Sequence, residues 1–289
     1  MEEIGMLYVI ISVVCSVAVS VILRLARKDG VQHLHLVVWN YPVATLATLL
    51  FLRPPMASVP IIELPWWIYV GLAFLLPTIF LCIAYAIQYS GIVRTEIAQR
   101  LSLFVPLLAA YFIFQEKMHA AKLLGITMGV LAILMSISWR KGRSGTGETW
   151  RYALAVFLGM GIIDILFKKM AVYDGVPYGF SMLMVFILSM VVAFAFLLHR
   201  IVQKGERLEI RAVLWGILLG IFNFGNILFY MKAHRALSES PSMVFTGMNI
   251  GVILLGALVG TRFFGERLTA WNKLGLVLAI ISVLIIAFL

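Results

Sequence analysis

The chain has 289 residues, of which 63% are hydrophobic and only 12% are charged, and its mean hydropathy is +1.04. Soluble domains are about half apolar and about a quarter charged, so this composition excludes an ordinary soluble protein and predicts a polytopic membrane protein. A net charge of +10 would suggest nucleic-acid binding in a soluble protein. In a membrane protein the same lysines and arginines set orientation and contact anionic headgroups, so we expect lipids and no nucleic acid as partners.

Ten apolar runs follow one another along the chain, each close to the roughly 20 residues that a helix needs to cross the hydrocarbon layer. They lie near residues 5–24, 34–52, 66–88, 92–114, 119–138, 151–172, 179–199, 212–234, 241–261 and 270–288. The first run follows the acidic sequence MEEIG with no basic segment before it, which indicates a retained helix rather than a cleaved signal peptide. Cys15 and Cys82 lie inside apolar runs and are expected to be small core residues.

The polar insert WRKGRSGTGETWR at residues 139–151 divides the ten runs into two groups of five. Its glycine, serine and basic residues are typical of a linker. We therefore expect a first five-helix repeat at 1–138, a linker at 139–150 and a second five-helix repeat at 151–289.

The two halves also match in sequence. Residues 114–134 align with residues 264–284 at a constant offset of 150, and RLARKDGV at 24–31 pairs with KMAVYDGV at 169–176. Two matches in the same order favour a duplication. Because each copy has an odd number of helices, the copies must be inverted, so the predicted fold is an all-α integral membrane protein with ten transmembrane helices in two inverted repeats. Such repeats are typical of secondary transporters, whose substrate site lies near mid-membrane.

This organisation and the twin motifs FQEKM and FGERL resemble the ten-span drug/metabolite transporter superfamily, EamA type. The resemblance covers nearly the whole chain and implies a small-molecule carrier, often an exporter of amino acids or related metabolites. We expect a multi-pass protein of the plasma membrane, which in a bacterium is the inner membrane. The fourth run departs from the family pattern because it carries charges where small residues are usual, which argues against a simple hydrophobic-drug substrate.

The main candidate site lies in the sequence IVRTEIAQRL at 92–101, which runs directly into an apolar stretch. Glu96 and Arg100 are four residues apart and share a helical face, about 7 and about 13 Å from Gly91. Charges at such depth are costly and usually face the bundle interior or water. We predict that Glu96, Gln99 and Arg100 bind substrate, and that Arg100 binds a carboxylate group of the substrate. A buried ion pair that only fixes packing is the alternative.

A second charged pair, Asp164 and Lys168, occurs in the sixth run. An aspartate at mid-membrane is a candidate proton site, because burial disfavours a charged carboxylate and a nearby cation favours it. Asp164 and Glu96 are therefore the predicted coupling residues, with protons as the expected coupling ion. An ion pair within the helix is the alternative for Asp164.

Three amides inside the apolar runs complete the predicted substrate site: Asn40, Asn223 and Asn249. Hydrogen bonding between helices is the commoner role of such residues. The histidines show no metal-binding spacing, and no HExxH, GxSxG or Walker motif is present, so we expect neither a metal, nor a cofactor, nor an enzyme. A channel and a lipid-processing membrane enzyme remain the alternative functions.

Glu116 and Glu266 each precede the last apolar run of their half. We interpret both as caps in the first turn of the following helix, where a carboxylate meets the positive end of the helix dipole. Arg24, Arg94 and Lys169 lie near helix ends and are interpreted as residues that extend to the headgroups.

The basic residues are unevenly distributed between the two ends of the predicted bundle. The connections after odd-numbered runs hold fifteen lysines and arginines, those after even-numbered runs hold seven, and the remaining one is Arg100. The positive-inside rule therefore predicts both termini outside, whereas the family resemblance implies both termini in the cytoplasm.

Overall fold

The computed structural model describes residues 2–55, 64–102, 105, 120–136, 149–171, 173, 175–205, 208–237 and 241–288. Helices account for most of these residues. Their bounds are α1 Glu2–Lys28, α2 His33–Leu52, α3 Trp66–Ser90, α4 Ile92–Leu101, α6 Ala120–Ser136, α7 Thr149–Ala171, α8 Tyr178–Lys204, α9 Ile210–Ala236, α10 Pro241–Arg262 and α11 Ala270–Phe288. Each of the ten predicted apolar runs thus coincides with a helix, although the fourth is described as a continuous helix only as far as Leu101.

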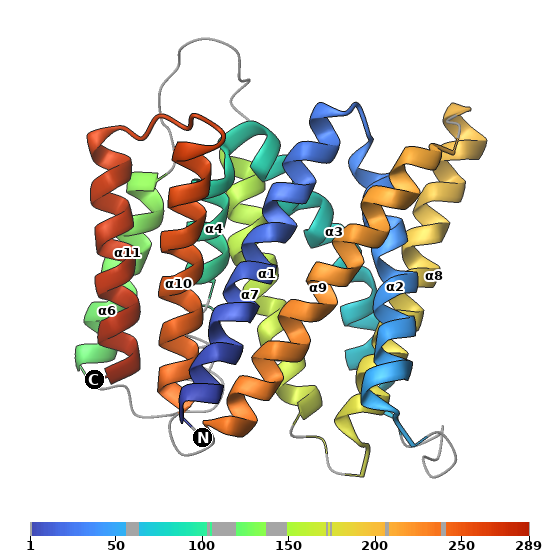
Figure 1. The fold of residues 1–289 in the computed structure, drawn as a ribbon, viewed down its shortest axis with the longest axis horizontal. Helices are drawn as coiled ribbons and strands as arrows, with labels where there is room; N and C mark the ends of the chain where they lie inside the picture. The colour runs from blue at the N-terminus through green and yellow to red at the C-terminus, as the bar shows by residue number, and fades with distance from the viewer. Residues whose placement is uncertain are drawn as a thin grey trace.

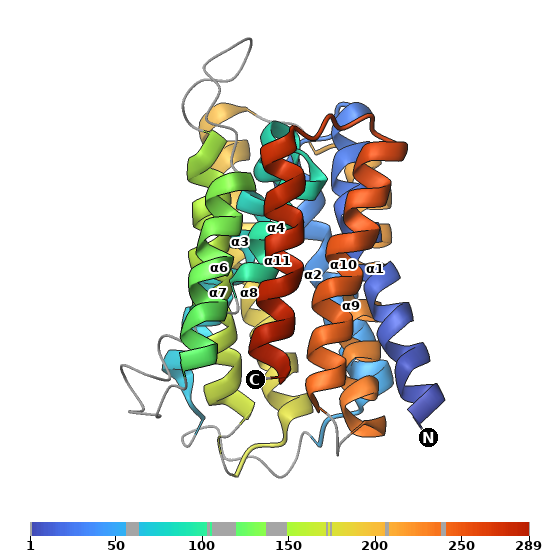
Figure 2. The ribbon, with the colours of Figure 1, turned by 90° about the vertical axis from the view of Figure 1, so that its left-hand side faces the viewer.

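The helices run roughly along one axis, and their connecting turns gather at the two ends of the bundle (Figures 1 and 2). Five of the described helices are long and apolar enough to cross a membrane, namely Glu3–Lys28, His33–Leu52, Trp66–Ser90, Tyr178–Lys204 and Ile210–Ala233. Such helices suit a bilayer because all their interior backbone groups are hydrogen-bonded within the segment. Shorter apolar helices occupy Gly247–Arg262 and Ala270–Ile285.

The bundle has two edges and a central group of helices. α6 packs on α11 at one edge and α2 packs on α8 at the other, with α1, α3, α4, α7, α9 and α10 between them (Figure 1). Both termini lie at the lower end in this view, whereas α1 and α10 end, and α4 begins, at the upper end. The upper end therefore brings together residues from opposite halves of the chain.

Helices at corresponding places in the two halves of the chain have corresponding packing partners. α1 packs on α9 and α10, and correspondingly α7 packs on α3 and α4. α2 packs on α9, and α8 packs on α3. α4 with α10, α6 with α11, and α2 with α8 are contacts between helices at equal places in the two halves. Exchanging the halves thus leaves these packing relations unchanged.

Apolar contacts hold the central helices together in separate clusters. One joins Val9, Val13 and Val17 of α1 to α9 and α10, and another joins Val93 and Ile97 of α4 to α10 and α11. The polar residues discussed below lie between these apolar contacts, on faces of α1 and α4 that are turned into the protein.

Candidate functional site

The charged face of α4 is buried. Glu96 is only 1% exposed, and the Arg100 side chain is 18% exposed. As the spacing of four predicts, the two side chains lie on one face, with Arg100 Nη2 3.9 Å from Glu96 Oε2. A direct charge-assisted hydrogen bond is about 2.7–2.9 Å long, so the two groups form only a long ion pair.

Three serines of α1 form a ladder at intervals of four residues: Ser12, Ser16 and Ser20. The Ser20 hydroxyl donates to Glu96 Oε1 at 2.5 Å, and Arg100 Nη2 donates to Ser16 Oγ at 2.9 Å. Each member of the α4 pair is therefore bound to its own hydroxyl of α1. Ser12 bonds to Asn226 of α9, at 2.8 Å from the amide oxygen and 2.9 Å from the backbone oxygen.

This arrangement leaves bonding capacity on both charged groups. Glu96 Oε2 and Arg100 Nε are buried, and neither has a hydrogen-bond partner in the described part of the chain. Unsatisfied buried polar atoms are costly, which makes them informative about function. An acceptor on Glu96 and a donor on Arg100 could bind the ammonium and the carboxylate of one small solute. Gly256 of α10 borders the site, since a Cβ there would lie 3.0 Å from Glu96 Cγ.

Asp164 of α7 belongs to the same charged region. Its charge interacts with that of Arg100, and the Tyr230 hydroxyl of α9 interacts with both. The alternative for Asp164, an ion pair with Lys168 within the helix, involves a side chain that lies outside the described residues. Arg100 therefore interacts electrostatically with two carboxylates, Glu96 and Asp164, that come from different halves of the chain.

The polar residues predicted beside the charged pair, Asn40, Asn223, Asn249 and Gln99, do not all lie in one site. Asn223 Nδ2 donates to Asn40 Oδ1 at 3.1 Å, so these two residues link α9 to α2. Asn249 is buried on α10, which packs on α4. Gln99 is half-buried, and its backbone oxygen accepts a bond from Ser102. The structure therefore brings Glu96 and Arg100 together, and the charge of Asp164 interacts with that of Arg100. Asn40 and Asn223 make a hydrogen bond between helices, which is the commoner role of such amides.

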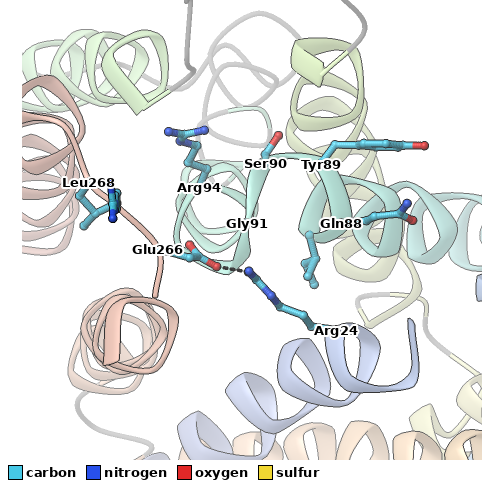
Figure 3. A pocket seen from close by; sticks show the side chains of 10 residues that line it. Arg24, Gln88, Tyr89, Ser90, Gly91, Arg94, Glu266 and Leu268 are labelled. Carbon is cyan, nitrogen blue, oxygen red and sulfur yellow. Dashed lines mark hydrogen bonds and ion pairs between the residues drawn. The ribbon is translucent and has the colours of Figure 1, made fainter. Parts of the chain in front are cut away.

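A second polar site lies at the upper end of the bundle, around a cavity of about 220 Å³ (Figure 3). The Glu266 carboxylate pairs with Arg24 of α1 and accepts the backbone N–H groups of Ile92 at 2.7 Å and Val93 at 3.2 Å. Glu266 thus caps α4, so the predicted cap of its own following helix is wrong. The interpretation of Arg24 as a headgroup contact is wrong as well, because its guanidinium binds Glu266 and lies 4.6 Å from the centre of the Phe264 ring.

α11 obtains its cap from a different pair of residues. Thr269 Oγ1 accepts the backbone N–H of Asn272 at 3.2 Å, and Asn272 Oδ1 accepts the N–H of Thr269 at 3.2 Å. This reciprocal pattern is a capping box, which satisfies the first turn of α11 without Glu266. Arg94 also donates to Asn272 Oδ1 at 3.2 Å, so it joins α4 to α11 rather than only extending to the headgroups. Glu116 lies outside the described residues.

The sequence analysis missed Ser16 and Ser20, although their spacing contained the signal. A polar stripe at intervals of four on an otherwise apolar helix predicts one buried polar face. The partner of that face could not be read from the spacing. Among the described residues, no group of three or more histidine, cysteine, aspartate or glutamate side chains could hold a metal ion.

Comparison with known proteins relates the whole chain to others. Residues 3–138 match the EamA-like transporter family. An uncharacterized protein of Haemophilus influenzae is 35% identical over 289 residues, which covers 97% of each chain. A crystal structure with 13% sequence identity covers 99% of this chain and 96% of its own, with a TM-score of 0.61, and so has a similar fold. The chain belongs to the EamA-like transporter family of the drug/metabolite transporter superfamily, a family of membrane transporters.

Proposed function

We propose that this transporter is a secondary carrier that exports a small carboxylate-bearing solute, such as an amino-acid-like metabolite. The observation that carries this proposal is the open geometry of Glu96 and Arg100. A pair that served only to neutralise itself would form short direct bonds. These two groups are instead held on separate serines, and each keeps one polar atom without a hydrogen-bond partner in the described residues.

The roles follow from the chemistry of the groups. Arg100 uses Nη2 to hold Ser16 and keeps Nε for an anionic group of the solute, which suits the planar fork of a guanidinium. Glu96 and Asp164, whose charges both interact with that of Arg100, bind an ammonium group or a proton. Proton binding at these carboxylates would couple solute movement to a proton gradient.

For the overall mechanism we propose ten membrane-spanning helices in two inverted repeats that alternate around this site. The helix positions and the exchange of packing partners between the halves support such repeats. In carriers of this kind the two repeats rock around a fixed site near mid-membrane. We place the protein in the plasma membrane, and in the inner membrane of a bacterium.

The test compares metabolites released by cells that produce the wild-type protein, the double variant Glu96→Leu with Arg100→Leu, or no protein. Wild-type cells should release a carboxylate-bearing compound, and the double variant should insert in the membrane but not release it. Replacing both charges together is tolerable for folding, whereas removing one partner alone would strand a buried charge at about 3–5 kcal/mol. Thr95→Val is the matched control, since the Thr95 hydroxyl bonds only to Gly91 O in the described structure.

Flux of the released compound is then measured in liposomes with the purified variants. Arg100→Lys should lower the flux roughly tenfold, because an ammonium keeps the charge but cannot hold Ser16 and the solute in the same planar geometry. Counterflow that saturates with solute concentration would separate a carrier from a channel, and conversion of the solute would reveal an enzyme. Near-normal flux through the folded double variant would refute the proposed site and direct attention to the surroundings of Asp164.

A further inference from the structure

The turn Phe264–Gly265–Glu266 connects three helices at the upper end of the bundle. Glu266 binds Arg24 of α1 and the first two N–H groups of α4, while its own N–H donates to Gly260 O at the end of α10 at 2.9 Å. Phe264 lies under Arg24 through a cation–π contact. One short turn thus joins α1, α4 and α10 (Figure 3).

Two glycines, Gly91 and Gly260, allow α4 and α10 to approach closely at the junction of α1, α4 and α10 around Glu266. A Cβ on Gly91 would lie 2.6 Å from Glu266 Oε2, and Gly91 has φ +90°, a conformation that disfavours any other residue. A Cβ on Gly260 would lie 2.7 Å from Val93 Cγ2 and 3.1 Å from the Glu266 carboxyl carbon. The backbones of α4 and α10 therefore meet closely around the carboxylate.

The junction lies one helical turn from the central charged pair. Arg24 is four residues after Ser20 on α1, and Ile92 is four residues before Glu96 on α4. The serine ladder therefore continues into Arg24, and Arg24 and Glu266 lie between Glu96 and this end of the bundle. At the opposite end, α1 makes apolar contacts, such as Gly5 with Leu237 and Val9 with Gly247, and Tyr8 makes a cation–π contact with Lys232.

We propose that Arg24 and the Phe264–Glu266 turn form a gate that closes the path from the central site to the face of the bundle on which α1 ends. This inference rests on the proposed carrier function, because a carrier must open and close each end in turn. The gate opens by release of Arg24 from Glu266 and Phe264. Glu266 then keeps its two backbone bonds to α4, while Arg24, at the end of α1, can extend to water or headgroups.

The experiment measures access to the central site without any solute. A single cysteine is placed at Ser16, in a background where Cys15→Ala and Cys82→Ala remove the native thiols. A membrane-impermeant maleimide is then added to one face of sealed vesicles of known orientation. Arg24→Gln should raise the labelling rate from the face on which α1 ends about fivefold. The variant removes an ion pair that stabilises only the closed state, so a larger fraction of the protein is open.

Arg27→Gln is the matched control, because it removes the same charge from the same turn of α1 but affects an exposed residue. Arg27→Gln and Arg24→Lys should both label like the parent protein. Phe264→Leu, which keeps the ion pair and the α4 cap, should give a smaller rise and provides a second test if Arg24→Gln does not fold.

The gate would be overturned if folded Arg24→Gln were labelled at the same rate as Arg27→Gln. If Arg24→Gln does not fold, the same conclusion follows when Phe264→Leu is labelled at the same rate as the parent protein. This result is distinguishable from a failure of the proposed function. The labelling reports conformation alone, whereas the proposed site is tested by the flux through the Glu96→Leu and Arg100→Leu double variant. A labelling increase without carboxylate flux would leave the gate intact and refute the proposed substrate class.

Discussion

At the residue scale, the spacing of Glu96 and Arg100 determines that they share a face but not that they bind each other. Side chains four apart on a helix can form a direct ion pair. Here Ser20 and Ser16 compete for the two groups, and Arg100 Nη2 lies 3.9 Å from Glu96 Oε2. The serines therefore position the charges in a way that leaves polar atoms available for a solute.

We predict that Ser16→Ala and Ser20→Ala each reduce transport more than they reduce stability. Either change removes one hydrogen bond to a buried charged group, which costs about 1.5–3 kcal/mol and lets the α4 pair close on itself. Solute flux in liposomes and thermal unfolding of the purified variants would measure the two effects. Ser282→Ala is the control: it removes another buried hydroxyl, whose bond to Gly125 O lies between α11 and α6. Normal flux in both ladder variants would refute a positioning role for the serines.

At the element scale, the first turn of α4 depends on a residue far away in the chain. A helix start leaves unpaired N–H groups and a positive dipole end, and a carboxylate satisfies both. Glu266 supplies this carboxylate across 174 residues, while α11 uses Thr269 and Asn272 from its own sequence. The FGERL motif is thus a link between helices of opposite halves, rather than a local helix start.

We predict that Glu266→Gln mainly lowers the folded yield, and that Glu116→Gln, at the matching position of the first half, acts in the same direction. An amide keeps one acceptor for the α4 backbone but loses the negative charge that meets Arg24 and the helix dipole, which we expect to cost about 1–2 kcal/mol. Membrane yield and thermal stability of each variant would measure the loss. Loss of transport from both variants at normal yield and normal stability would argue against helix capping as the main role of the two glutamates.

At the scale of the whole molecule, the uneven distribution of basic residues distinguishes the two ends. The sequence of the odd-numbered connections, one of which contains the gate turn, holds fifteen basic residues, whereas that of the even-numbered connections holds seven. Cytoplasmic loops of membrane proteins carry the excess of lysine and arginine. The gate would then close the path on the cytoplasmic side.

We predict that a reporter fused after Leu289 is active on the external side of the membrane. Both termini lie at the same end of the bundle, so a reporter fused before Met1 should give the same result (Figure 1). Paired fusions that report internal and external locations, respectively, would measure the orientation. An internal C-terminus would mean that the usual family arrangement prevails over the loop charges, and the gate would then face outward.

Taken by itself, the sequence determined the helices and the family. A bilayer requires long apolar segments whose backbone groups are hydrogen-bonded internally. Composition and run length were therefore enough to locate most of the described helix ends to within a few residues. The two copies of the FxE motif were enough to indicate the transporter superfamily, and the spacing of four correctly placed Glu96 and Arg100 on one face. These features depend on local periodicity or on short motifs, which are present in the chain before it folds.

Only the tertiary structure decided which polar groups meet. Ser20 and Glu96 are 76 residues apart, and Arg24 and Glu266 are 242 residues apart, so no local pattern links them. The sequence analysis placed Glu266 in the first turn of its own following helix, because it could use only neighbours along the chain. In the folded protein, the packing of α1 against α10, of α4 against α10 and of α4 against α7 brings other partners closer. A buried polar group binds whichever partner the packing presents, and that choice belongs to the assembled bundle.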